Sequence, residues 1–396
     1  MRDAPVSRTS DASPTRVLVW QWGRRGAGPR VAVEMAAGLG SLPGCRTMLS
    51  LSTGAEILKQ RSSPTVELPV ATYRSAVGYV GRLLGTPLRL RRLLRRLRAL
   101  APDVALCAMP GPLDLEMALA LRRLRIPFLV VVHDADRHPG DGSPVQMLLQ
   151  RRLIAWSDGV VALTQHVADR LGEQGALDGR PLLMASLPPF VFGPKPPRPL
   201  AHGGRLRLLC FGRLLPYKGL DLLADALSLP GFAGRLDVRV VGQGPDAPEL
   251  QRLGSLSGVR VENRWVPEGE IAELIAWADA VVLPYREASQ SGVAAAAIAA
   301  RRWVVATRVG GLVEQFHREP LAIMCEPDAR DLHRAVGRLL TSPPAHTSDD
   351  LDPHQAWRSV AAGLLDEISQ QILDRAVRHP AAMQAGPPPI GGVTAR

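Results

Sequence analysis

Short apolar runs alternate along the chain with longer segments in which apolar residues recur at a helical period. Four runs in the first half predict buried parallel strands: residues 16–22, 104–109, 128–133 and 159–164. The segments between them, such as 30–42 and 114–125, have the apolar spacing of helices. This alternation predicts a doubly wound α/β domain.

A proline-rich segment at residues 186–204 interrupts the pattern and has no helical period, which predicts an interdomain linker. The alternation then restarts, with six further strand candidates: residues 205–212, 236–244, 259–266, 279–285, 302–311 and 321–326. Two similar α/β halves joined by a linker leave a cleft between them. Ligands are expected there, at the carboxyl ends of the strands.

The chain has 396 residues, which favours two domains over one. The predicted limits are residues 15–188 for the N-terminal domain, 189–204 for the linker and 205–376 for the C-terminal domain. The last helix is a candidate to pack back on the N-terminal domain. Residues 1–14 and 377–396 are rich in Pro, Gly, Ala and Ser, which predicts disordered tails.

Composition fits a soluble globular protein, with 46% hydrophobic residues. The formal net charge of +11 favours an acidic partner: nucleic acid, anionic lipid or a phosphorylated small molecule. The four cysteines lack metal-ligand spacing and predict reduced core residues. There is no apolar run near the roughly 20 residues of a membrane span and no signal-peptide pattern. We therefore expect a cytoplasmic protein, or one peripheral on the inner face of the plasma membrane.

Residues 82–100 carry seven arginines in a segment of helical period. The leucines share one face and several arginines share the other: Leu90, Leu93, Leu94 and Leu97 against Arg92, Arg95 and Arg96. Two interpretations stay open. The leucine face packs on the domain core, or residues 82–98 lie on anionic lipid as a basic amphipathic helix. Nucleic acid is disfavoured as a partner, because only 4% of the chain is aromatic.

The stretch "FGRLLPYKG" places two cations at the end of a predicted strand. Arg213 offers a planar fork of donors suited to phosphate oxygens, and Lys218 adds a point charge. The helix predicted after Gly219 brings its positive end to the same place. The alternative is that both are ordinary surface cations on a loop.

A glycine-rich loop, "GRRGAGPR" at residues 23–30, follows the first predicted strand. Gly26 and Gly28 allow the backbone to approach a ligand closely, and amides exposed there favour phosphate. The loop is neither a Walker lysine loop nor a clean dinucleotide fingerprint, so it is weak evidence by itself.

Two further strand-to-helix turns lie in the second half. In "LPYREASQSGV", the helix-start amides of Ser291, Gly292 and Val293 form a candidate phosphate cradle, although Ser291 alone is also a common helix cap. Glu287 precedes them and suits sugar hydroxyls. The turn at residues 308–316 repeats the strand, glycine and helix order.

These motifs occur in the order typical of one enzyme family. "FGRLLPYKG", "VVGQGP" (240–245), "LPYREASQSGV" and "VVATRVGGLVE" (304–314) resemble the C-terminal half of the family 4 glycosyltransferases over about residues 205–330. The N-terminal half matches more loosely, through the glycine loop and "VVHDADRHPG" (131–140). The resemblance implies the GT-B fold, with two Rossmann-like domains facing a central cleft, and a retaining transfer from a nucleotide-diphosphate sugar.

The resemblance also implies roles for particular residues. The implied donor-binding set comprises Gly26, Gly28, Arg213, Lys218, Ser291, Gly292 and Val293. Glu287 corresponds, within one residue, to the first glutamate of the family's paired-glutamate motif, which contacts the transferred sugar. His133 corresponds to a histidine near the reacting sugar, or alternatively is a structural residue at a strand end. The second glutamate, which holds the ribose, is missing, because residues 294–297 are all alanine.

The main hypothesis is a metal-independent glycosyltransferase without a cofactor, in which the leaving phosphate takes the acceptor proton. A glycan, lipid-linked or small-molecule acceptor is expected, such as a polysaccharide precursor. The missing glutamate keeps a second hypothesis open, a non-catalytic binding protein or partner subunit. A dinucleotide-dependent oxidoreductase is disfavoured by the lack of GxGxxG after the first strand. Asp134 and Asp136 form a DxD pair, but the second α/β half disfavours a metal-dependent GT-A enzyme.

Overall fold

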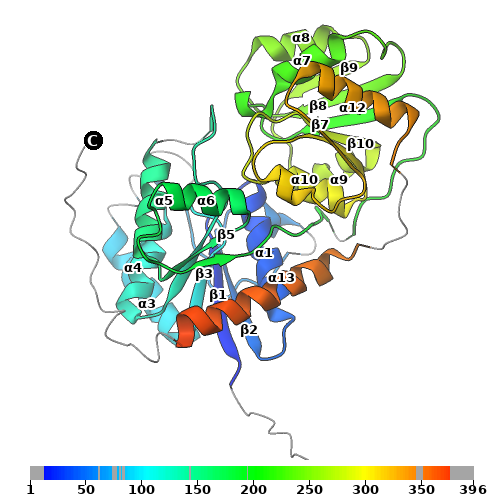
Figure 1. Ribbon diagram of the computed structural model, residues 1–396. Coiled ribbons are helices and arrows are strands. Elements are labelled where there is room, and N and C mark those ends of the chain that lie inside the picture. Colours follow the sequence, from blue (N-terminus) through cyan, green and yellow to red (C-terminus); the bar gives the residue numbers. More distant parts are fainter. Residues whose placement is uncertain are drawn as a thin grey trace, which may run out of the picture.

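The protein consists of two α/β halves, shown as a ribbon in Figure 1. The computed structural model describes these parts of the chain: residues 13–60, 63–73, 78–79, 82, 85–141, 144–193, 195–344 and 351–374. The predicted tail at 377–396 lies outside the described residues, as does the tail at 1–14 except for its last two residues.

The first half is built on a six-stranded parallel sheet in the order β2-β1-β3-β4-β5-β6. Its strands are β1 (Thr15–Gln21), β2 (Cys45–Leu51), β3 (Val104–Cys107), β4 (Phe128–Val132), β5 (Gly159–Ala162) and β6 (Leu182–Met184). The four predicted strands are confirmed. The other two escaped prediction because β2 mixes polar with apolar residues and β6 has three residues.

Helices cover both faces of this sheet (Figure 1). They are α1 (Ala27–Gly40), η1 (Glu56–Lys59), α3 (Thr86–Leu100), α4 (Asp114–Leu124), α5 (Pro144–Trp156) and α6 (Gln165–Glu173). In α3, Leu90, Leu93 and Leu97 are buried in the core of this half, and the helix packs against α4. The leucine face of the arginine-rich segment is therefore occupied by the protein itself, which leaves its arginine face to the surroundings.

The second half repeats the architecture in the order β12-β11-β10-β7-β8-β9, again parallel. Its strands are β7 (Leu206–Phe211), β8 (Leu236–Gly242), β9 (Val259–Asn263), β10 (Ala280–Leu283), β11 (Trp303–Thr307) and β12 (Ala322–Cys325). Its helices are η2 (Pro216–Lys218), α7 (Leu220–Ser228), α8 (Pro248–Ser255), α9 (Glu268–Trp277), α10 (Gly292–Ala299), α11 (Leu312–Gln315) and α12 (Ala329–Thr341). All six predicted strands are confirmed.

The chain then crosses back to the first half. Helix α13 (Pro353–Ile368), which continues into η3 (Ser369–Leu373), packs along α1. Gly38 of α1 allows this close approach, because a Cβ there would lie 2.9 Å from the carbonyl oxygen of Trp357. The indole of Trp357 donates to the carbonyl of Pro189, 3.1 Å away, so the helix also braces the connection between the halves. None of the helices in the described part of the chain has the length and apolar character of a membrane span.

Each sheet has a point where the strand order reverses. In the first half, β2 and β3 flank β1, and in the second half β8 and β10 flank β7. Loops after neighbouring strands diverge at such points and open a crevice at the carboxyl ends of the strands. The predicted fold class, two Rossmann-like domains facing a central cleft, is confirmed, and the two crevices set the position of the site.

Candidate active site

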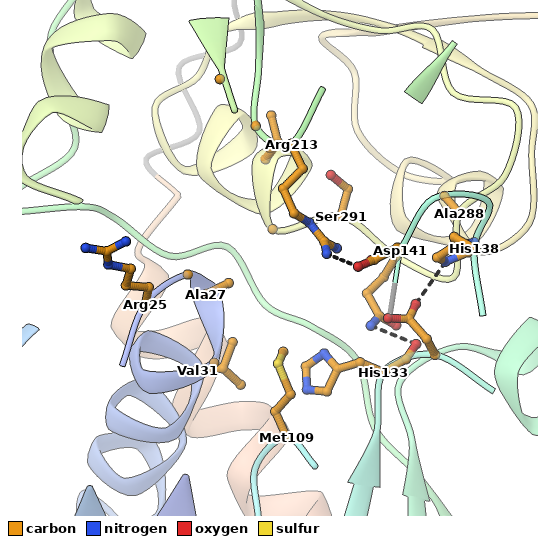
Figure 2. A pocket seen from close by; sticks show the side chains of 18 of the residues that line it. Arg25, Ala27, Val31, Met109, His133, His138, Asp141, Arg213, Ala288 and Ser291 are labelled. Atoms are coloured by element: carbon orange, nitrogen blue, oxygen red, sulfur yellow. Dashed lines mark hydrogen bonds and ion pairs between the residues drawn. The ribbon is translucent and has the colours of Figure 1, made fainter. Parts of the chain in front are cut away.

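A cavity of about 550 Å³ lies between the two halves. This volume falls within the range of small-molecule sites. Its walls include segments that follow β1, β3 and β4 in the first half and β7, β8, β9 and β10 in the second. Eight of the predicted site residues line it: Gly26, Gly28, His133, Arg213, Lys218, Ser291, Gly292 and Val293. Figure 2 shows several of their side chains converging from both halves.

The turn after β7, residues 212–219, carries the two predicted phosphate-binding cations, and we call it the phosphate turn. Gly219 has φ +64°, and a Cβ there would lie 1.8 Å from the carbonyl oxygen of Pro284, so the turn requires glycine at this position. Tyr217 is buried beneath the turn, and its hydroxyl accepts a hydrogen bond from Arg213 at 3.1 Å. Arg213 is thus held with its guanidinium at the cavity (Figure 2).

Arg213 also forms an ion pair with Asp141 of the other half. Asp141 is the last residue of the loop at residues 134–141, which follows β4 and which we call the clasp loop. Gly140, just before it, has φ +80°, and a Cβ there would lie 2.9 Å from a ring carbon of Pro216. The clasp loop therefore rests directly on the phosphate turn, and one carboxylate occupies part of the donor surface of Arg213.

Lys218 lies over two aromatic rings. Its Nζ is 3.6 Å from the ring centre of Tyr285 and 4.7 Å from that of Tyr217, both within cation–π range. Burial and the nearby charge of Arg213 lower the pKa of Lys218 to about 7. An anion bound beside it favours the charged form and raises that pKa again. The ammonium is therefore matched to a negatively charged ligand.

The start of α10 provides the third wall of the predicted phosphate site. The Ser291 hydroxyl caps the helix by accepting from the amide of Ala294 at 3.3 Å, and the Ser291 amide donates to Gln315 at 3.0 Å. Gly292 and Val293 occupy the first two helical positions, whose amides have no carbonyl partner within a helix. These amides and the positive helix end are suited to phosphate oxygens.

The four alanines at residues 294–297 follow in α10 and are buried. They occupy the place where the resemblance requires the second glutamate. Small apolar side chains let the helix pack closely on its sheet and supply no carboxylate.

His133 lies at the end of β4 and is 6% exposed. Its Nε2 is 2.8 Å from the carbonyl oxygen of Ala108, which can only accept, so Nε2 carries the proton. Burial lowers the pKa of His133 more than this hydrogen bond raises it, which favours the neutral ring. In the neutral ring Nδ1 is an acceptor, so His133 can accept a hydrogen bond from a hydroxyl in the cavity (Figure 2).

Glu287 lies at the rim and does not line the cavity itself. Its side chain is 53% exposed, and its Oε2 lies 3.3 Å from Nδ1 of His138 in the clasp loop. His138 does line the cavity. Of the nine predicted site residues, Glu287 is thus the one that reaches the cavity through a neighbour.

The glycine loop closes the cavity from the first half. Gly26 has φ +81° and caps α1, and a Cβ on Gly28 would lie 2.8 Å from the side-chain nitrogen of Gln21. The neighbouring Arg25 extends over the ring of Trp265 in the second half, 5.3 Å from its centre. Gly26 and Gly28 both line the cavity, so backbone without side chains forms this part of its wall.

The two carboxylates of the DxD pair face different partners. Asp134 contacts Nε2 of His138 at 3.1 Å, and Asp136 accepts from Arg170 at 2.7 Å and from Gln174 at 2.8 Å. Over the described residues, no group of three His, Cys, Asp or Glu side chains is arranged to hold a metal ion. The pair is used to shape the clasp loop.

Sequence reasoning missed several residues of the site. His138, Asp141 and Tyr217 are examples, and Trp265 and Glu268 also line the cavity. For His138 and Asp141, a signal was available: the polar run "DADRHPGD" directly follows a buried strand, at the carboxyl end where ligands are expected. The partners that these residues find in the other half could not be deduced from spacing.

Comparisons with known proteins agree with this architecture. The family model described as glycosyl transferases group 1 matches residues 205–342, and that described as glycosyl transferase 4-like domain matches residues 19–185. A GDP-mannose-dependent alpha-(1-6)-phosphatidylinositol monomannoside mannosyltransferase of Mycolicibacterium smegmatis is 29% identical over 233 residues, 50% of this chain and 57% of the relative. A D-inositol 3-phosphate glycosyltransferase of Actinosynnema mirum is 32% identical over 191 residues, 42% of this chain and 45% of the relative. The chain thus spans about half the length of the curated relatives it matches.

Solved structures share the whole fold at low sequence identity. Sucrose-phosphate synthase from Thermosynechococcus elongatus superposes with a TM-score of 0.61 at 14% identity, over 91% of this chain and 99% of that one. The HepE protein of Anabaena, solved with UDP and glucose, gives a TM-score of 0.62 at 15% identity, over 93% and 99%. A glycosyltransferase family model thus matches each half of the chain, and the fold around the shared cavity is the GT-B fold.

Proposed function

We propose that the protein transfers a sugar from a nucleotide-diphosphate donor to an acceptor hydroxyl, with retention of configuration and without a metal ion. The observation that carries the proposal is the convergence of Arg213, Lys218 and the start of α10 on one cavity between the halves. Guanidinium, ammonium and helix-start amides are the groups that bind diphosphate oxygens. The retaining course rests on the resemblance of the motifs to family 4.

In the proposed reaction, the bond between the anomeric carbon and the diphosphate oxygen breaks while the acceptor oxygen bonds to the same face of that carbon. The acceptor proton passes to the departing diphosphate. Arg213, Lys218 and the amides of Gly292 and Val293 stabilise the charge that develops on the phosphate oxygens. They supply the positive charge that a divalent cation provides in other transferases.

The remaining site residues face the sugar in this proposal. His133, neutral with Nδ1 as acceptor, orients a sugar hydroxyl, and Glu287 accepts hydroxyls at the rim of the cavity. Gly26 and Gly28 let the first half close over the phosphates.

For the acceptor we propose a glycan or lipid-linked molecule, met at the inner face of the plasma membrane. One relative is named for action on a phosphatidylinositol mannoside, which supports a lipid-linked acceptor. The exposed arginines of α3 support contact with anionic lipid, since each cation near such a surface contributes about 1 kcal/mol. They are Arg91, Arg92, Arg95, Arg96 and Arg98.

A second candidate function is a non-catalytic nucleotide-binding partner subunit. The observation that favours it is the buried alanine run at residues 294–297, which leaves α10 without the family's ribose-binding carboxylate. This candidate predicts that nucleotide binds and no sugar is transferred.

The test begins with thermal unfolding of the protein in a panel of UDP, GDP, ADP and dTDP. One nucleotide is expected to raise the unfolding temperature by several degrees, since a ligand at 100 times its Kd contributes about 2.7 kcal/mol. The matching sugar donors are then supplied with acceptor mixtures, and the anomeric configuration of the product is determined by NMR. No stabilisation by any nucleotide contradicts the proposal, and binding without transfer favours the second candidate.

A further inference from the structure

The imidazole of His138 connects the two halves at the edge of the cavity. Its Nε2 lies 3.1 Å from Asp134 in its own clasp loop, and its Nδ1 lies 3.3 Å from Glu287, on the loop after β10 of the other half. The ring stacks on Tyr217 of the phosphate turn, with centres 4.6 Å apart and planes 16° from parallel. Contacts from three segments therefore fix one small ring.

These contacts define the charge of the ring. Carboxylates accept hydrogen bonds, so both ring nitrogens carry a proton when both contacts are made, and the ring is an imidazolium. Burial lowers the pKa of His138, whose side chain is 11% exposed, but the hydrogen bonds and charges of Asp134 and Glu287 raise it further, to above its ordinary value. The bridge is thus charged at low pH and loses its charge as the pH rises through the raised pKa.

Other charged groups lie near the His138 ring, either beyond Tyr217 or elsewhere in the clasp loop. Tyr217 covers one face of the ring and itself contacts Arg213 and Lys218. Asp141 of the clasp loop is paired with Arg213. The carboxylates in direct contact with His138 are therefore Asp134 and Glu287, one from each half.

We infer that His138 is a positioning residue for sugar transfer, which holds the Glu287 carboxylate at the rim of the cavity only while the two halves are closed on each other. This inference rests on the proposed function, because Glu287 has a sugar to face only in a glycosyltransferase. The phosphate-binding cations share Tyr217 with the His138 ring, but their other partners differ from those of His138, since Arg213 pairs with Asp141 and Lys218 also lies over Tyr285. His138 therefore acts on the sugar end of the reaction.

The contact itself is tested by NMR titration of the protein with isotope-labelled histidine, in which His138→Gln identifies the signal. We expect the midpoint of the His138 titration to fall by about one pH unit in Glu287→Gln, because one of its two carboxylates is lost. Asp136→Asn is the matched control, since this clasp-loop carboxylate pairs with Arg170 and Gln174. An unchanged midpoint in Glu287→Gln overturns the bridge between the halves.

The role is tested by separating nucleotide affinity from turnover. In His138→Gln, the affinities for UDP and GDP by calorimetry are expected to stay within about twofold of wild type, while turnover of UDP-glucose or GDP-mannose, whichever is accepted, falls about tenfold at unchanged KM. The double variant His138→Gln with Glu287→Gln is expected to be no slower than Glu287→Gln alone, because the two residues act as one unit.

The outcomes distinguish a failure of this inference from a failure of the proposed function. If wild type binds neither UDP nor GDP, nor any other nucleoside diphosphate, the proposed function fails, and the NMR titration still decides whether the bridge exists. If His138→Gln weakens nucleotide binding as Arg213→Ala does, or leaves turnover unchanged, the positioning role is overturned while the proposed function stands.

Discussion

The clasp loop (residues 134–141) and the phosphate turn (residues 212–219) face each other across the cavity and carry opposite charge. The clasp loop brings three carboxylates after β4, and the phosphate turn brings Arg213 and Lys218 after β7. The turn is held within its own half by Gly219 and the buried Tyr217, whereas the loop also has partners in the other half, through Asp141 and His138. In the proposed function, the second half supplies the anion site, and the Asp141 carboxylate of the first half pairs with one of its cations, Arg213.

The largest effect on nucleotide affinity is expected when both cations of the phosphate turn are removed. Arg213→Ala with Lys218→Ala is expected to weaken the binding of nucleoside diphosphate about 100-fold or more, because each charge-assisted hydrogen bond contributes about 1.5–3 kcal/mol. Calorimetry measures the loss. Arg252→Ala is the control, since Arg252 pairs with Asp225 on the surface, and it should bind as wild type does.

For the clasp loop, we expect that removing a carboxylate increases the affinity for nucleoside diphosphate. In Asp141→Asn, nucleoside diphosphate is expected to bind about fivefold more tightly, because Arg213 loses a competing carboxylate and an exposed ion pair contributes about 1 kcal/mol. Asp136→Asn removes the same charge without touching Arg213, so it controls for the general field. Equal affinities for the two variants would show that Asp141 does not compete with the ligand.

Because the pKa of Lys218 is lowered to about 7, we expect the protein to take up protons when a diphosphate binds beside it. At pH 8 most of the unbound protein has a neutral Lys218, and a bound diphosphate raises the pKa again, so binding is expected to take up close to one proton. At pH 6 the lysine is already charged and uptake should approach zero. Calorimetry in buffers of different ionisation enthalpy counts these protons, and uptake that does not vary with pH would contradict a diphosphate beside Lys218.

The smallest effect concerns the third wall, the start of α10. Ser291→Ala removes the side-chain cap and is expected to lower the free energy of unfolding by about 1 kcal/mol. Urea unfolding measures it, with Ser255→Ala, an exposed serine at the end of α8, as the control expected within about 0.5 kcal/mol of wild type. Nucleotide affinity should change little, because the amides of Gly292 and Val293 remain.

The fold was largely predictable, because a buried parallel strand appears in the sequence as a short continuous run of apolar residues. Ten of the twelve strands stand out as runs such as "FLVVV" at residues 128–132. The edge strands β2 and β6 do not, since an edge position tolerates polar residues and short length. In the second sheet the edge strands β9 and β12 were predicted, so an edge position alone does not hide a strand.

The candidate site was predictable as far as it depends on local turns. Glycine turns after strands and the helix start at Ser291 are encoded within a few residues, so the sequence predicts them. The pairs His138–Glu287 and Arg213–Asp141 join residues 149 and 72 positions apart, and they exist because of how two separate sheets face each other. Spacing along the chain contains no information on such contacts.

Calorimetric comparison of each nucleoside diphosphate with its monophosphate tests the central claim most directly. If the second half clamps a diphosphate, UDP or GDP should bind at least about tenfold more tightly than UMP or GMP, a difference of about 1.4 kcal/mol. The preference should disappear in the variant that lacks both Arg213 and Lys218 side chains. Equal binding of diphosphate and monophosphate by the wild-type protein would contradict the account.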